Sequence, residues 1–79
     1  MELKDTVEMM LSDDYKERFK AEYYQVKIRT QKLQGMLETW NVLNFEPVCD
    51  YKIIWEQYTT MNQYLEKLLK RAFVEGIDL

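Results

Sequence analysis

Apolar residues recur at alternating spacings of three and four along two stretches of the chain, one on each side of Pro47. The first stretch is formed by Phe19, Tyr23, Val26, Thr30, Leu33, Leu37 and Trp40. The second is formed by Ile54, Tyr58, Met61, Leu65, Leu68 and Ala72. Residues spaced in this way lie on one side of an α-helix and repeat every seven residues, which is typical of helices that pack lengthwise. The two stretches therefore predict an all-α fold built on an antiparallel two-helix hairpin.

Polar residues upstream of the first stretch mark where we expect its helix to begin. Asp14, followed three residues later by Glu17, has the form of a capping box. We therefore expect the first long helix to span about residues 14–40. Before it, apolar residues that include Leu3 predict a short N-terminal helix over about residues 3–11.

The second long helix is expected to follow a loop over residues 41–49. Asp50 is a natural N-cap residue, so this helix should span about residues 51–75. Gly76 is placed to end it in the left-handed conformation, with Ile77 folding back onto the helix.

Two apolar side chains lie within the loop. Leu43 and Phe45 are two residues apart, as in a short extended piece that presents both side chains on one side. Glu46 is also biased towards an extended backbone, because the ring of Pro47 disfavours a helical conformation of the residue before it. We expect Leu43 and Phe45 to plug the end of the hairpin.

The length of the chain limits how such a hairpin can be stabilised. Its 79 residues form one expected domain, residues 1–79, and domains of this size need reinforcement. A lone Cys49 allows no intrachain disulfide and is best interpreted as a loop residue rather than a redox group. Because two helices leave apolar surface uncovered, we expect a homo-oligomeric helical bundle. The expected interface consists of Tyr24, Ile28, Trp55, Leu69 and Phe73.

The distribution of charge says more than the net charge of −3. Residues 15–32 carry six bases and two acids, whereas residues 1–14 and 33–66 are each acidic overall. Duplex DNA requires a broader positive surface, so we do not expect a dedicated DNA-binding protein. No apolar stretch is long enough to span a bilayer and the first residues are acidic, so we expect a cytoplasmic protein without a membrane partner.

The residues that catalysis usually requires are scarce in this chain. It has no histidine and no glycine-rich phosphate loop, and Ser12 is its one serine. Asp13 and Asp14 could bind a metal ion or act as acid and base, but their position favours helix capping. We therefore expect no enzymatic activity, no cofactor and no metal site.

The basic segment also contains tyrosines, and together they form the best candidate site. Its expected ligand-binding residues are Lys16, Lys20, Tyr23, Tyr24 and Lys27. Ammonium groups could neutralise phosphates while phenol rings stack on a base. Two alternatives remain open. Lysines beside a helix seam often cover it with their methylene stems and pair with acids of the neighbouring helix, and Tyr23 could be a core residue.

The chain also resembles a family of small helical-hairpin proteins. The resemblance is carried by the opening residues 1–7, the run 14–24, residues 71–72 and 75–77 at the end, and two spaced patterns between them. These patterns are Phe45, Pro47 and Cys49, followed by Gln57, Met61, Tyr64 and Leu65. They are similar to those of uncharacterised proteins encoded by phages and prophages of gut bacteria, and the similarity spans nearly the whole chain.

The resemblance implies a phage origin and, from it, a role in disarming host immunity. One mechanism is a sponge, in which an oligomer sequesters a nucleotide immune signal through the lysine and tyrosine residues. A second is an inhibitor that docks a helical face on a defence protein, as an anti-CRISPR does, through Tyr24, Ile28 and Trp55. A third is a structural or scaffolding accessory of the phage. We favour the sponge, because the segment that stands out is basic and aromatic together.

Overall fold

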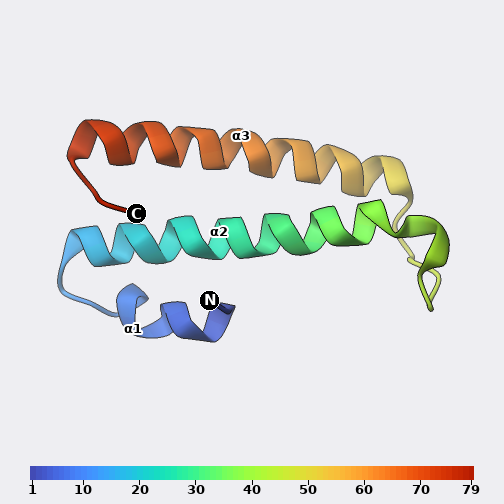
Figure 1. The fold of residues 1–79 in the computed structure, drawn as a ribbon, viewed down its shortest axis with the longest axis horizontal. Coiled ribbons are helices and arrows are strands. Elements are labelled where there is room, and N and C mark those ends of the chain that lie inside the picture. The colour runs from blue at the N-terminus through green and yellow to red at the C-terminus, as the bar shows by residue number, and fades with distance from the viewer.

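The computed structural model describes residues 1–79 and is built of helices without strands (Figure 1). Its two long helices lie antiparallel and pack against each other, and a short helical segment precedes them, so the predicted all-α hairpin is confirmed. The elements in chain order are η1 (Leu3–Thr6), α1 (Val7–Met10), α2 (Tyr15–Glu38), η2 (Trp40–Val42) and α3 (Tyr51–Glu75).

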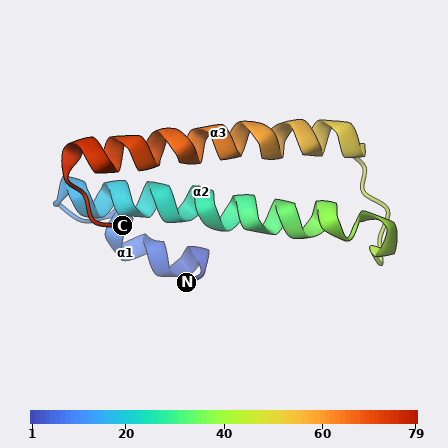
Figure 2. The same ribbon diagram turned by 45° about the horizontal axis from the view of Figure 1, so that its top comes forward.

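Helix α2 lies in the middle of a flat molecule that measures 42 × 24 × 16 Å. Helix α3 packs along one side of it, and the N-terminal segment of η1 and α1 packs along the other (Figures 1 and 2). The hydroxyl of the fully buried Thr6 fastens this segment, since it donates to the Leu3 carbonyl at 2.7 Å and accepts from Gln25 Nε2 at 3.0 Å. Ile28, which we expected in an interface between copies, is buried next to Leu3. The N-terminal segment thus covers Ile28, one of the five residues that we had assigned to a partner.

Side chains and a glycine end the long helices much as the sequence predicts. Asp14 caps α2 by accepting from the Lys16 amide at 2.9 Å, although its expected reciprocal pairing with Glu17 does not form. Asp50 caps α3 through the Ile53 amide at 3.0 Å. After α3 the chain reverses through Gly76, whose φ is 69°.

The well-packed core lies at the open end of the hairpin, where the N-terminal part of α2 and the C-terminal part of α3 meet the C-terminal tail. It consists of Phe19, Tyr23, Leu68, Ala72 and Ile77. Ile77 folds back as predicted, with its amide 2.9 Å from the Ala72 carbonyl and its side chain buried. Towards the loop the seam is only half buried, as at Leu37 and Ile54. The hairpin is therefore tight at its open end and looser at its closed end.

The closed end of the hairpin differs from our expectation. Phe45 is exposed rather than plugging the hairpin, and Leu43 is only half buried. Instead, the rings of Trp40 and Tyr51 meet edge to face, with centroids 5.3 Å apart. Aromatic rings in this geometry attract each other beyond their apolar burial, so the two residues flanking the loop join its ends.

A polar network joins α2 and α3 along one edge of the seam. Arg71 donates to the Tyr15 hydroxyl at 2.9 Å, and that hydroxyl donates to Glu75 at 2.8 Å. Desolvation lowers the pKa of Arg71, but its hydrogen bonds to Tyr15 and Glu75 outweigh this effect. The pKa of Arg71 is therefore raised overall, and the group stays charged. On the same edge Tyr64 donates to the Glu22 carboxylate, and this bond holds the pKa of Tyr64 above its ordinary value of 10.0.

Truncating the most buried large side chain should test the core. We expect Leu68→Ala to lower the free energy of unfolding by about 2–5 kcal/mol, because it leaves a cavity where little can relax. Val74→Ala, on the exposed side of the same helix, should change it by less than about 1 kcal/mol. Urea unfolding followed by circular dichroism measures both, and equal losses would contradict the assigned core.

The bond between Tyr64 and Glu22 should also make stability depend on pH. Because the folded state raises the pKa of Tyr64, its contribution is present below pH 10.0 and is lost as the pH rises through the folded pKa. We expect the wild type to lose more unfolding free energy than Tyr64→Phe between pH 9.5 and 11, while the other tyrosines contribute equally to both proteins. Parallel curves in urea titrations would refute this contribution.

Candidate functional site

The five predicted ligand-binding residues all lie on α2, but their surroundings separate them into two groups. Tyr23, Tyr24 and Lys27 contact one another, whereas Lys16 and Lys20 have other partners. Lys16, Lys20 and Lys27 fall within about 40° of one another around the helix, on the side that borders the seam with α3. The lysines and the polar network of Arg71 and Tyr64 lie on opposite sides of the seam between α2 and α3. The predicted alignment is present, and what differs is the surroundings of each residue.

Tyr23 and Lys27 form the better organised group. Tyr23 is a core residue, only 8% exposed, and its ring meets the edge of the Tyr24 ring with centroids 5.1 Å apart. The Lys27 ammonium lies over the Tyr23 ring, 5.8 Å from its centroid. Such a contact attracts the cation to the ring without neutralising its charge, so Lys27 is held in place and remains available to an anion.

An open groove between α2 and α3 runs past these two residues. It has a volume of about 370 Å³. Its α2 wall consists of Tyr23, Lys27, Thr30, Gln31 and Gln34, and its α3 wall of Asn62, Leu65, Glu66 and Leu69. Three side-chain amides in these walls can each donate and accept hydrogen bonds. The groove thus offers one cation, one carboxylate, several amides and apolar side chains within a single concave surface.

Lys16 and Lys20 lie outside this groove, towards the open end of the hairpin. The Lys16 ammonium is 3.5 Å from the Gly76 carbonyl, and the Lys20 ammonium is 3.3 Å from Glu17 of its own helix. The alternative in which these lysines pair with acids of the neighbouring helix is not what the structure contains. No ion pair joins α2 to α3 on this side, and Lys27 has no carboxylate partner.

The α3 wall of the groove is the part that sequence reasoning missed. We predicted ligand contacts from α2 alone, whereas Asn62 and Glu66 of α3 face the same space. A signal for them was present, because Asn62 and Glu66 are the two polar residues in an otherwise apolar and aromatic run along α3 that includes Trp55 and Leu69. A polar residue within an apolar helix face often has a specific partner.

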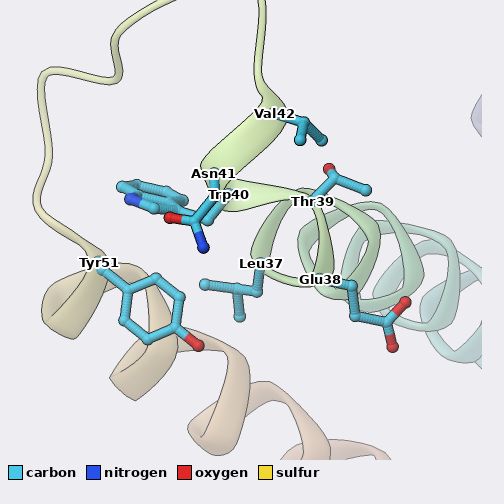
Figure 3. A pocket seen from close by; sticks show the side chains of 7 residues that line it. All are labelled: Leu37, Glu38, Thr39, Trp40, Asn41, Val42 and Tyr51. Atoms are coloured by element: carbon cyan, nitrogen blue, oxygen red, sulfur yellow. The ribbon is translucent and has the colours of Figure 1, made fainter.

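A second hollow at the closed end of the hairpin is larger but chemically poorer. It has a volume of about 560 Å³, and the side chains of Leu37, Trp40 and Tyr51 point towards one another beside it (Figure 3). Glu38 is its one charged residue and points away from Tyr51 (Figure 3). With an acid and no base, this hollow suits an anionic ligand less well than the groove beside Lys27.

Two further observations bear on the chemistry of the chain. No group of three histidine, cysteine, aspartate or glutamate residues is close enough to hold a metal ion together. None of the helices combines the length and apolar character needed to cross a membrane.

Comparison with known proteins identifies the family. The model of the Sequestin family, described as Sequestin, matches residues 13–73. The match begins just before the N-cap of α2 and ends near the end of α3, so it includes both walls of the groove. No curated protein and no solved structure matches the chain. Because the match covers most of its length, the chain belongs to the Sequestin family.

Proposed function

We propose that this protein is a phage-encoded anti-defence protein that sequesters a nucleotide immune signal in the host cytoplasm. It acts as a sponge, by binding the signal stoichiometrically and without chemical change. The family description fits a protein that withdraws a ligand from solution. The resemblance to phage and prophage proteins supports the anti-defence setting.

The observation that carries the proposal is the unpaired ammonium of Lys27 over the ring of Tyr23, inside a groove lined with amides. A phosphate accepts charge-assisted hydrogen bonds from such a cation, and these are stronger than bonds between neutral groups. Gln31, Gln34 and Asn62 can donate to and accept from the edge of a base. Leu65 and Leu69 supply apolar surface for its faces.

Lys16 and Lys20 act on the same ligand at longer range. Both lie on the groove side of α2 but outside the groove, where they raise the local positive potential of an acidic protein. Tyr24 supports Tyr23 through its edge-to-face contact. Their part in binding is therefore electrostatic steering and support, and Lys27 makes the direct contact.

The groove favours binding over catalysis because its one aliphatic hydroxyl is already engaged. Thr30 donates to the Val26 carbonyl at 2.7 Å, and no histidine exists to activate it. A nucleophile requires a base in contact with it. Glu66, the one carboxylate of the groove, makes no hydrogen bond to Thr30. A ligand bound here would be released intact.

A second function, inhibition of a defence protein by direct contact, is favoured by one separate observation. Large apolar side chains remain exposed along α3 and the loop, among them Trp55, Phe73 and Val48. Apolar surface of this kind marks protein interaction sites. The same surface would serve a scaffolding accessory of the phage.

A ligand screen tests the sponge directly. We expect a member of a panel of cyclic dinucleotides, cyclic trinucleotides and cyclic ADP-ribose isomers to raise the melting temperature, since a ligand that binds the native state stabilises it. Heating the complex should release that ligand unchanged, as judged by mass spectrometry. No stabilisation by any of them, together with a host defence protein bound stoichiometrically, would replace the sponge by the inhibitor.

Substituting the groove lysine should separate the site from its surroundings. We expect Lys27→Gln to weaken binding of the nucleotide identified in the screen by at least about tenfold in calorimetry, because it removes a charge-assisted contact. Lys32→Gln is the matched control, with the same change of charge on the exposed, opposite side of α2. Equal losses for both variants would contradict the groove as the site.

The outer lysines should behave differently from Lys27. We expect the double variant Lys16→Gln and Lys20→Gln to weaken binding about two- to fivefold at low salt and less at 0.5 M NaCl, because salt screens charges that act from a distance. Calorimetry at two salt concentrations measures the difference. A loss that is independent of salt would make these lysines direct ligands.

A further inference from the structure

Helix α3 carries a second stripe of side chains beside the seam that it forms with α2. This stripe comprises the residues within about 40° of Asn62 around the helix. They are Tyr51, Trp55, Tyr58, Asn62, Glu66, Leu69 and Phe73. Trp55 and Leu69 are each 49% exposed and Phe73 is 89% exposed, so the chain itself leaves much of the stripe uncovered.

We propose that this stripe packs antiparallel against the same stripe of a second copy, with Asn62 on the two-fold axis, and that the pairing completes the binding groove. The groove then belongs to the dimer, because each copy contributes Lys27 and Tyr23 to one shared site. The dimer is argued from the stripe alone, whereas the shared nucleotide site rests on the proposed function.

The stripe is chemically complementary to an antiparallel copy of itself. In an antiparallel pair, residues equally far from Asn62 in the sequence meet, so Trp55 packs on the partner's Leu69 and Tyr51 packs near the partner's Phe73. Each contact occurs twice, as an isologous interface requires. Glu66 meets the partner's Tyr58, whose hydroxyl can donate to the carboxylate and so satisfy the one acid of the stripe.

Asn62 suits the axis because an amide is its own partner. Two facing amides can each donate to and accept from the other. A single asparagine within an apolar helix interface is a well-attested way of fixing register, since any shift would bury it against apolar side chains. It also lies close to the middle of α3, which spans Tyr51–Glu75, so pairing about it overlaps the two helices along their whole length.

The size of the available face and the small core both favour a second copy as the occupant. Only nine of the 79 residues are buried, and the core lies at one end of the hairpin. The broad faces of the molecule extend over 42 × 24 Å. A face of that size can bury on the order of 800 Å² per partner, the area of a standard stable interface.

Pairing through α3 also brings the two grooves together. Helix α2 lies beside α3, and the groove between them is lined by Asn62 and by Lys27. If Asn62 is on the axis, the two Lys27 side chains come close to that axis from opposite copies. Like charges repel at short range, so this arrangement calls for an anion between them. The fitting ligand is therefore one that presents phosphate charge towards both copies, at one ligand per dimer.

Engineered disulfides test the register. In a Cys49→Ser background, which removes the one native thiol, Asn62→Cys should form a covalent dimer on mild oxidation. Lys67→Cys, exposed on the far side of the same helix, should remain largely uncrosslinked. Sedimentation equilibrium of the unmodified protein should give twice the mass of the chain. A monomeric mass, or crosslinking only at position 67, would overturn the proposal.

A second pair of variants separates antiparallel from parallel packing, which also places residue 62 opposite itself. When Trp55→Cys and Leu69→Cys proteins are mixed, each in the Cys49→Ser background, the antiparallel dimer predicts disulfides between the two different variants. Parallel packing predicts Trp55→Cys homodimers instead. Predominance of those homodimers would refute the two-fold axis at Asn62.

The stoichiometry of binding distinguishes failure of this proposal from failure of the proposed function. We expect calorimetry with the nucleotide found in the screen to give one ligand per two chains. One ligand per monomer would preserve the sponge and overturn the shared site. An unmodified protein that is dimeric in sedimentation but binds no nucleotide in the panel would preserve the α3 interface and overturn the nucleotide site.

Discussion

The packing of Leu68 and Ala72 of α3 against Phe19 and Tyr23 of α2 is the contact on which the rest of the structure depends. It fixes which residues of the two helices lie at the same level, because buried side chains in contact allow no sliding without loss of burial. The level of Tyr23 sets the position of Lys27, and the level of Leu68 sets that of Asn62. A groove with a cation on one wall and an amide on the other is therefore a consequence of this small core.

The helices and their ends could be predicted because their signals are local. Seam spacing, the capping residues Asp14 and Asp50, and the reversal at Gly76 each depend on residues close together in the chain. The fate of Ile28 could not be predicted in the same way. Helical spacing gives the face on which a residue lies but not the element that covers it, and here the cover depends on the distant hydrogen bond between Gln25 and Thr6.

The candidate site shows the same division. Spacing alone placed the three lysines on one side of α2, and this is what the structure contains. Their separate roles depend on how far along the seam each lysine lies and on the C-terminal tail, because Lys16 donates to the Gly76 carbonyl. The α3 wall escaped prediction because a contact between two helices requires their register. The prediction for the loop was wrong for another reason, since the rings of Trp40 and Tyr51 meet at the closed end of the hairpin while Phe45 stays exposed.

The uneven packing of the hairpin bears on the sponge function that we propose. A sponge has no turnover, so it must hold its ligand with a dissociation constant below the concentration at which the signal acts. Tight binding by so short a chain requires that little ordering remains to be done when the ligand arrives. Lys27 is already held over a buried ring, which removes part of that cost. A second copy on α3 would remove more, because it would order the half-buried end of the seam and exclude water from the groove before any ligand is bound.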